Sequence, residues 1–247
     1  MSRILYTAMN GAQRLLQQQA QVTNGLANVN TVGFKQQLQL QRAVPLQGGA
    51  VLPTRVSTVS TTVGTHMAEG PLAATGHALD LAIDGPGWFA VQTPAGEAYT
   101  RAGDFQVNEQ SLLVTAQGYP VLSADNEVIE IPEQGSVHFS GDGQITVLGA
   151  GDNPRDVQVL GQIKRVNPQA DDLVRGEDGW FRLAQGGVAP MDEQVRIVSG
   201  FLEKSNVSAA ESMVALINNA RQFEMQMKVI SDSNTNQERA NSILSVN

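Results

Sequence analysis

Cysteine is absent from the 247-residue chain, and the three histidines, His66, His77 and His138, lie at least 11 residues apart. A disulfide scaffold, a thiolate metal site and a cysteine nucleophile are therefore excluded, as is a close histidine pair of the HExxH type. No stretch approaches about 18 consecutive apolar residues, so we expect no membrane span. The N-terminus lacks the apolar run of a cleaved secretory signal, which leaves export by another route open.

Proline and glycine are scarce at both ends of the chain. All ten prolines lie between Pro45 and Pro190, and residues 201–247 contain neither proline nor glycine. Because these residues punctuate turns, both ends are predicted to be long helices and the middle to be rich in turns. We therefore expect an α+β fold with four parts: an N-terminal assembly helix in residues 1–42, an extended linker in 43–68, a central mostly β domain in 69–200 and a C-terminal assembly helix in 201–247.

Acidic residues are missing from the first 68 positions, where five basic residues give a charge of +5. Residues 69–206 carry 20 acids and 8 bases, so the body of the chain is acidic. A basic end can bind nucleic acid, but five charges spread over 68 residues form no patch, and only Tyr6 and Phe34 offer rings for stacking there. No nucleic-acid partner is expected.

A heptad-like spacing of three and four residues runs through the N-terminal segment, which is predicted to be helical over residues 3–30. Its positions are Leu5, Ala8, Ala12, Leu15, Gln19, Val22, Leu26 and Val29. A helix that is polar on most of its surface does not fold alone in water. An amphipathic helix packed on its own domain is the simpler alternative, but the many neutral amides on the flanks favour contact with partner helices, because unpaired charges are costly to desolvate. Gly33 suits a left-handed cap beyond the helix.

The C-terminal segment has a similar pattern. Ser208 and Glu211 have the spacing of a capping box, which predicts a helix that begins just after Ser208. The apolar positions that follow again step by three and four residues: Met213, Leu216, Ala220, Phe223, Met227 and Ile230. Its methionines fill a core or form an interface that adapts to different neighbours, and both interpretations stay open. The two terminal helices are expected to pair as a coiled-coil-like assembly domain.

The middle of the chain alternates short apolar runs with turn signals, which is typical of a compact β domain. Asp142-Gly143 is a hairpin turn signal between two of the predicted strands. The predicted strands are Leu79–Ile83, Trp88–Gln92, Ala98–Arg101, Phe105–Val107, Leu112–Thr115, Val137–Phe139, Gln144–Leu148, Val157–Ile163, Trp180–Leu183 and Val195–Ser199.

Patterns that carry chemistry are weak in this sequence. Gly85-Pro-Gly-Trp-Phe-Ala90 matches G-x-G-x-x-A, but Pro94 and Gly96 follow where a dinucleotide site needs a helix, so that interpretation is rejected. Asp80, Asp84 and Asp104 can supply a carboxylate pair only if the fold brings them together, and turns and strand ends explain them without catalysis. We expect no enzyme, no cofactor, no metal site and no small-molecule substrate.

Three segments resemble one family. The first follows N-x-L-A-N-x-x-T-x-G-F-K, a signature of bacterial flagellar rod and hook proteins, and its positions are Asn24, Leu26, Ala27, Asn28, Thr31, Gly33, Phe34 and Lys35. The second is the turn Gly85-Pro-Gly-Trp-Phe89, followed by Tyr99-Thr-Arg-Ala-Gly-Asp-Phe105, which is similar to the central β domain of that family. The third, Ser205-Asn-Val207 and the helix through Ala220-Arg-Gln-Phe-Glu-Met225, is similar to its C-terminal helix.

The resemblance implies a structural subunit of the flagellar basal-body rod, and within the family a proximal-rod type. It also implies assembly with other rod proteins through the terminal helices, export by the flagellar type III apparatus without a cleaved signal, and a place in the rod that crosses the periplasm and transmits torque. Two alternatives stay open: a distal-rod subunit of the same family and, from another class, a wall-binding β module dimerised by its helices.

Overall fold

The computed structural model describes residues 3–45, 56–132, 135–149 and 157–244. The chain divides into two compact units. The first, here the helix unit, consists of Met1–Val29, Gln36–His66 and Val207–Asn247. The second, the β unit, consists of Asn30–Lys35 and Met67–Asn206. Both units are therefore assembled from segments that are distant in sequence.

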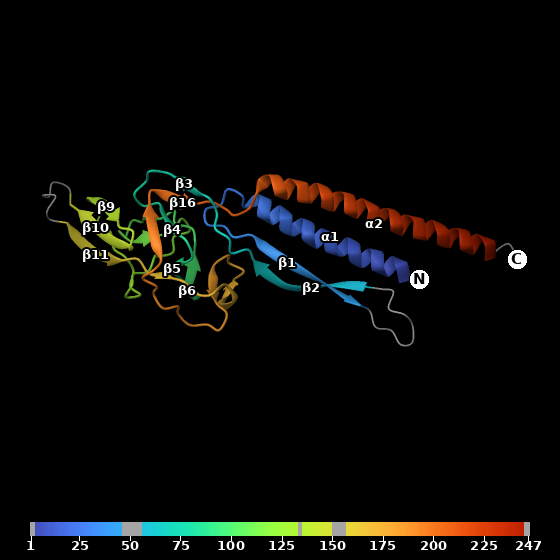
Figure 1. Ribbon diagram of the computed structural model, residues 1–247, viewed down its shortest axis with the longest axis horizontal. Helices are drawn as coiled ribbons and strands as arrows, with labels where there is room; N and C mark the ends of the chain where they lie inside the picture. Colours follow the sequence, from blue (N-terminus) through green and yellow to red (C-terminus); the bar gives the residue numbers. More distant parts are fainter. Residues whose placement is uncertain (1–2, 46–55, 133–134, 150–156, 245–247) are drawn as a thin grey trace. The chain divides into compact units, whose positions relative to one another are not determined.

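Two long helices, α1 (Arg3–Ala27) and α2 (Ala209–Leu244), run antiparallel and contact each other within the helix unit (Figure 1). Gly11 of α1 faces Gln226, and Gly25 faces Val207 just before α2. The absence of a side chain at these glycines lets the neighbouring segment approach α1 closely.

The buried face of α1 coincides only in part with the predicted heptad seam, of which Leu15, Val22 and Leu26 are half-buried. Ala8 and Ala12 are buried as expected, but Gln19 is exposed, whereas Gln18 is half-buried and Gly25 is buried. A straight helix has 3.6 residues per turn, so its contact face drifts away from a strict seven-residue repeat. The helix also ends at Ala27, so the last predicted seam position, Val29, lies beyond it.

The start of α2 agrees with the predicted N-cap, since the Ser208 hydroxyl accepts a hydrogen bond from the Glu211 N–H at 3.3 Å. The helix thus begins at Ala209, and residues 201–203 form a strand instead of helix. The polar side chains of Ser212 and Asn219 are buried on α2. Among the predicted seam positions, half are half-buried (Leu216, Phe223, Ile230) and half are exposed (Met213, Ala220, Met227).

A long antiparallel hairpin completes the helix unit (Figure 1). Its strands are β1 (Gln37–Pro45) and β2 (Val56–Thr65), paired from Gln37 opposite Thr65 to Pro45 opposite Val56. The expected linker over 43–68 therefore has strand structure, which begins before position 43. Positions 46–55 of that linker lie outside the described residues.

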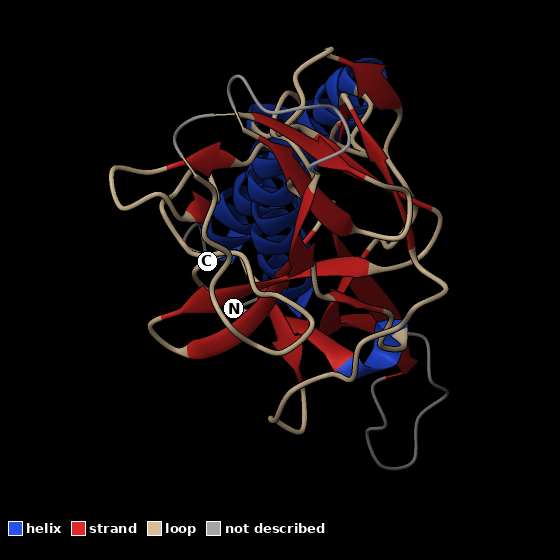
Figure 2. Ribbon diagram, turned by 90° about the vertical axis from the view of Figure 1, so that its left-hand side faces the viewer, coloured by secondary structure: helices blue, strands red, loops and turns tan. Residues whose placement is uncertain are grey.

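The β unit contains a five-stranded sheet in the order β12-β5-β6-β14-β13, a three-stranded sheet in the order β11-β10-β9, and the pairs β15-β4, β16-β3 and β7-β8. The described part of this unit also has one short 3-10 turn, η1 (Ala170–Asp172), among its strands (Figure 2). The strands are β3 (Leu72–Ala74), β4 (Leu81–Asp84), β5 (Trp88–Thr93), β6 (Gly96–Thr100), β7 (Gln106–Val107), β8 (Leu113–Val114), β9 (Ser136–Phe139), β10 (Gln144–Leu148), β11 (Gln158–Gln162), β12 (Arg165–Val166), β13 (Leu173–Arg175), β14 (Phe181–Leu183), β15 (Arg196–Ser199) and β16 (Phe201–Glu203).

Two apolar clusters form the core of the β unit. The larger is built around Phe89, Phe105 and Trp180, and the smaller around Trp88 and Phe181. The Phe89 and Phe105 rings meet edge to face, with centroids 5.2 Å apart. Because β5 contributes alternate residues to the two clusters, this strand lies between them.

Every predicted strand between positions 79 and 199 overlaps an observed one, so those predictions are confirmed. Four short strands were missed: β3, β12, β13 and β16. Each has only two or three residues and lacks an apolar alternation of its own, so its strand structure depends on the partner with which it pairs. The rejected dinucleotide motif is followed by β5 rather than a helix, which confirms the rejection.

Candidate functional site

The N-terminal signature is divided between the two units, because the chain passes from one to the other between Val29 and Asn30. Its first half closes α1: Asn24 and Ala27 are exposed, Leu26 is half-buried, and the Asn28 side-chain amide donates to the Asn24 carbonyl at 2.9 Å. Its second half belongs to the β unit: Thr31 is exposed, whereas Gly33 is half-buried and Phe34 and Lys35 are buried. The eight signature residues therefore belong to two different units.

Gly33 adopts the left-handed conformation that was expected, with φ of +66°. A Cβ atom at this position would lie 2.2 Å from the backbone nitrogen of Ala102 and 2.4 Å from the carbonyl carbon of Arg101. Only glycine fits so close to another backbone. The Gly33 N–H donates to the Glu203 carbonyl at 2.7 Å, which joins this segment to the end of β16.

Phe34 is buried in the β unit, and the Arg175 guanidinium lies over its ring at 4.8 Å from the centroid. The same guanidinium donates to the Lys35 carbonyl at 3.2 Å. Burial lowers the pKa of Arg175. A cation over an aromatic face is stabilised by the ring quadrupole, so Arg175 of β13 helps to hold Phe34 and Lys35 in place.

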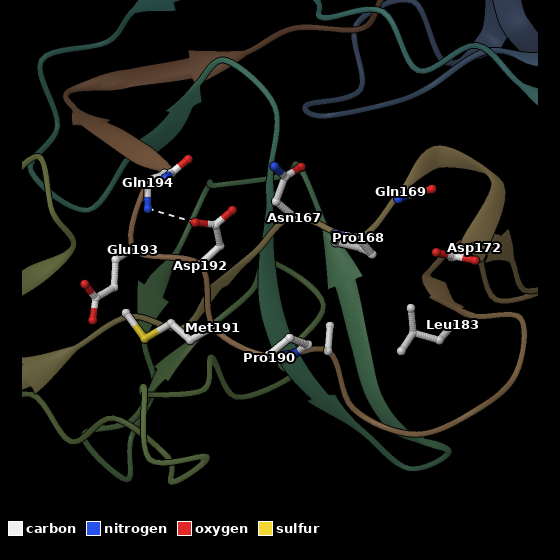
Figure 3. Close-up of a pocket in the computed structure, with 11 residues that line it drawn as sticks. Asn167, Pro168, Gln169, Asp172, Leu183, Pro190, Met191, Asp192, Glu193 and Gln194 are labelled. Atoms are coloured by element: carbon white, nitrogen blue, oxygen red, sulfur yellow. Dashed lines mark hydrogen bonds between the residues drawn. The ribbon is translucent and has the colours of Figure 1, made fainter.

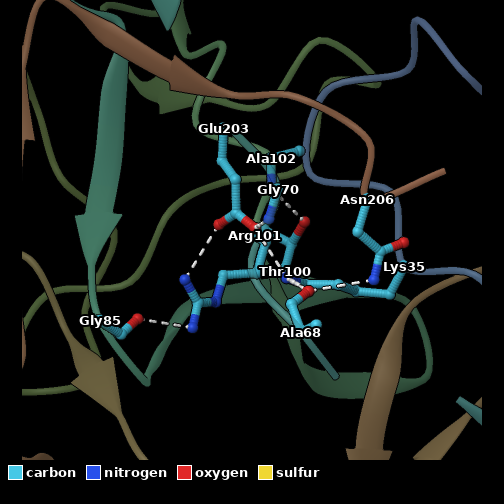
Figure 4. A network of polar contacts seen from close by, with 9 residues as sticks. All are labelled: Lys35, Ala68, Gly70, Gly85, Thr100, Arg101, Ala102, Glu203 and Asn206. Atoms are coloured by element: carbon cyan, nitrogen blue, oxygen red, sulfur yellow. Dashed lines mark hydrogen bonds and ion pairs between the residues drawn. The ribbon is translucent and has the colours of Figure 1, made fainter. Parts of the chain in front are cut away.

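Lys35 and Arg101 bind one carboxylate, that of Glu203, in the interior of the β unit (Figure 4). The Lys35 Nζ donates to Glu203 Oε1 at 2.7 Å and to the Ala68 carbonyl at 2.8 Å. Arg101 Nη1 donates to Glu203 Oε2 at 2.9 Å, and the Gly70 N–H donates to Oε1 at 2.8 Å. Lys35 and Glu203 are each only 1% exposed, so water does not screen this ion-pair network.

Burial is the larger influence on Lys35 and lowers the pKa of its ammonium group, while the Glu203 carboxylate acts in the opposite direction. Arg101 adds a second positive charge that also lowers the pKa of Lys35. Two cations thus share a single buried anion, and loss of that anion would leave both uncompensated.

Asn206 completes the arrangement from the C-terminal side. Its N–H donates to the Phe34 carbonyl at 3.2 Å, and its side-chain amide donates to the Ala68 carbonyl at 3.0 Å. We refer to Gly33–Lys35, Ala68–Gly70, Arg101 and Glu203–Asn206 together as the clasp. Sequence reasoning found Gly33, Phe34 and Lys35 as signature positions but missed Glu203, whose only signal is a carboxylate next to the apolar pair Phe201-Leu202.

A shallow groove of about 690 Å³ lies elsewhere in the β unit (Figure 3). Its carboxylates belong to Asp172, Asp192 and Glu193, and its apolar lining includes Leu183 and Met191. Asp192 accepts a hydrogen bond from the Gln194 N–H at 2.8 Å, and Asp172 and Glu193 are exposed. None of the three carboxylates that line the groove is therefore fully buried.

One wall of the groove is anchored by Tyr99, whose hydroxyl accepts a hydrogen bond from the Ala189 N–H at 2.7 Å. The Tyr99 side chain is completely buried, and burial raises its pKa to about 12. The hydroxyl therefore stays protonated and acts as a structural support for the loop that carries Ala189.

The aspartates considered for catalysis have structural positions. Asp80 and Asp104 face each other across an isolated β-bridge, and burial, with a smaller effect from Asp80, raises the pKa of Asp104. Asp84 is exposed at the end of β4. Within the described ranges, no cluster of three His, Asp or Glu side chains is arranged to hold a metal ion. The helices of the described residues also lack a stretch that is long and apolar enough to span a bilayer.

Three family models match the chain in the order expected. They are the flagella basal body rod protein model over residues 5–35, the FlgE/F/G D1 domain model of flagellar hook proteins over residues 82–147, and the C-terminal model of flagellar basal body rod FlgEFG proteins over residues 198–243. The first ends at Lys35, and the third includes the Glu203–Asn206 part of the clasp.

Curated relatives agree with the family models. The flagellar basal-body rod protein FlgF of Salmonella typhimurium and that of Escherichia coli are each 42% identical to this chain, with all of both proteins covered. The basal-body rod protein FlgG of Bacillus subtilis is 31% identical over 94% of the chain and 96% of its own length. These matches do not favour the distal-rod or the wall-binding alternative. The chain belongs to the FlgF type of flagellar basal-body rod proteins, which are structural subunits and not enzymes.

Proposed function

We propose that this rod subunit assembles through α1 and α2, which form a coiled-coil-like layer with the corresponding helices of neighbouring subunits. The observation that supports this most directly is the apolar surface that α2 leaves uncovered. Met213, Val214, Ile217 and Met225 are all more than half exposed, although α2 already contacts α1 on another face. Three of them, Met213, Val214 and Ile217, lie within five residues near the start of α2, and exposed apolar side chains grouped in this way are typical of interaction sites.

The first helix adds to the same proposal, because Tyr6, Met9 and Leu16 of α1 are also more than half exposed. With 25 residues in α1 and 36 in α2, the C-terminal part of α2 extends past the N-terminal end of α1 in the antiparallel pair. Flexible methionine side chains adapt to neighbours that are not identical, as a rod made of several related proteins requires.

A heterologous contact that repeats with a rotation that does not close builds an open helical rod rather than a closed ring. In our proposal the helices make that repeated contact, both with copies of this chain and with other rod proteins of the proximal and distal segments. The rod then crosses the periplasm and transmits torque, and the β unit serves as a rigid body attached to the helical layer. We further propose that the flagellar type III apparatus exports the chain without cleavage of a signal.

The test of assembly is Ile217→Asp, which introduces a charge into the uncovered apolar face of α2. Ile217 is 54% exposed, so the substitution should leave the subunit folded. Burial of an unpaired carboxylate in an interface costs several kcal/mol, about 3 or more, so the variant should be absent from purified basal bodies and non-motile in soft agar.

The matched control is Gln222→Asp, which adds the same charge at an exposed polar position of α2. It should assemble almost normally. Normal motility of Ile217→Asp would contradict assembly through this face. Retention of that variant inside the cell would instead assign Ile217 to export.

A further inference from the structure

We propose that the clasp acts as a mechanical clamp, which holds together all the segments of the β unit that connect it to the helix unit. In this view Gly33, Phe34 and Lys35 occur in the signature to close the β unit and not to contact neighbouring subunits. The closure itself does not depend on how the rod assembles; only its consequence for force transmission rests on the proposed function.

The connections between the two units all involve segments that meet in the clasp. The chain crosses between the units four times: before Asn30, after Lys35, before Met67 and after Asn206. Three segments of the β unit therefore lead directly into crossings: 30–35, which has a crossing at each end, the segment that starts at 67, and the segment that ends at 206. The clasp contains residues from all three segments, although Gly70 lies 133 positions and Lys35 lies 168 positions before Glu203.

Glu203 is the hub of these contacts. It receives the Gly33 N–H on its carbonyl and the Lys35 ammonium on its carboxylate, both from the first segment. The Gly70 N–H from the second segment binds the same carboxylate oxygen as Lys35. Arg101 binds the other carboxylate oxygen and also donates to the Gly85 carbonyl at 2.8 Å, which anchors the hub to the body of the β unit (Figure 4).

Each connecting segment is thus cross-linked to the others as well as to the sheet. Lys35 and Asn206 both donate to the Ala68 carbonyl, so the second segment is held by the first and the third at once. The antiparallel pairing of β16 with β3 joins the second and third segments further along the chain. Displacement of one connecting segment must therefore break several of these bonds together. The low exposure of the hub strengthens each of these bonds.

The experiment is backbone amide hydrogen exchange on the full-length subunit with Lys35→Met, which removes the ammonium group and keeps an unbranched side chain. Exchange at Gly33, Gly70 and Asn206, whose N–H groups bind within the clasp, should accelerate at least about tenfold, because local opening becomes easier. Exchange at Leu113 and Val121, whose N–H groups bind core carbonyls of the β unit, should change less than about twofold.

Two further variants make the result decisive. Lys228→Met makes the same change at an exposed lysine of α2, which is not part of the clasp, and it should leave clasp exchange unchanged. Glu203→Gln keeps the volume and an acceptor for Gly70, and it supplies a milder perturbation if Lys35→Met gives no soluble protein. Combined with Lys35→Met, it should accelerate exchange by less than the product of the two single effects, since both changes act on one bond.

Unchanged exchange at the clasp amides, or equal acceleration at clasp and core amides, would overturn the proposal. In cells, Lys35→Met should still enter basal bodies and should lose swimming speed most in viscous medium, where torque is high. Its absence from basal bodies while the purified subunit remains folded would make Lys35 an assembly residue and refute our inference. That outcome is independent of the Ile217→Asp test, which judges the proposed mode of assembly by itself.

Discussion

Replacement of Gly33 by alanine tests the close approach on which the clasp depends. The substitution has two separable effects. A positive φ of +66° disfavours any residue that has a Cβ, by about 1–2 kcal/mol. In addition, the new Cβ would overlap the backbone of Arg101 and Ala102 at 2.2–2.8 Å, and backbone atoms inside a sheet domain cannot move aside as a side chain can.

We expect the 30–35 segment to leave its site in response. The hydrogen bond from the Gly33 N–H to Glu203 is then lost, at about 1 kcal/mol, and the Phe34 ring becomes exposed, at about 2 kcal/mol. Because the segment that leaves its site no longer carries the backbone strain, we expect these two losses alone to lower the free energy of unfolding of the β unit by about 3 kcal/mol.

The matched control is Gly76→Ala. Gly76 has a similar φ of +75°, but no atom lies within 4 Å of its hypothetical Cβ. It should therefore lose only about 1–2 kcal/mol. Urea unfolding followed by tryptophan fluorescence measures both variants, because Trp88 and Trp180 lie in the β unit. Equal destabilisation of the two variants would refute the steric argument and place Gly33 outside any close contact.

Three further substitutions test other parts of the structure. Tyr99→Phe leaves the Ala189 N–H buried without an acceptor, so thermal unfolding should show a loss of about 1–3 kcal/mol. Asp104→Asn should raise the melting temperature at neutral pH and lose this advantage in acid. The folded state raises the pKa of Asp104, so its carboxyl group destabilises the fold as the pH rises above the ordinary pKa of 3.8. A difference in melting temperature that does not change with pH would contradict this. Leu26→Asp should abolish motility and incorporation into basal bodies while the β unit stays folded. Its control is Gln17→Asp at an exposed position of α1, and an equally immotile control would disprove the role of Leu26.

Local signals in the sequence were sufficient for the strands and for the cap of α2. Ser208 and the Asp142-Gly143 turn act through neighbours three or fewer residues away, so their effect can be read without knowledge of the fold. The helix face was harder, because the buried side of α1 follows a 3.6-residue period, so that Gln18 is half-buried and Gly25 is buried while Gln19 is exposed.

The clasp was out of reach for a different reason. Lys35 and Glu203 are 168 positions apart, and no periodic pattern links them. A lysine after an apolar residue is usually solvated, so its type alone does not indicate burial. We predict that a fragment of residues 69–200 folds by itself; it lacks Gly33–Lys35 and Glu203, so we expect it to be less stable than the complete chain.

The division of the β unit into distant segments has a consequence for the order in which the chain folds. A ribosome delivers Lys35 long before Glu203, and contacts of such large sequence separation form slowly because loop-closure entropy must be overcome first. The N-terminal segment thus waits unpaired through synthesis of almost the whole sheet domain. A chain that stops before position 203 never acquires the carboxylate that Lys35 and Arg101 share. Completion of the β unit therefore requires synthesis of the chain at least as far as Glu203, whose carboxylate both cations share.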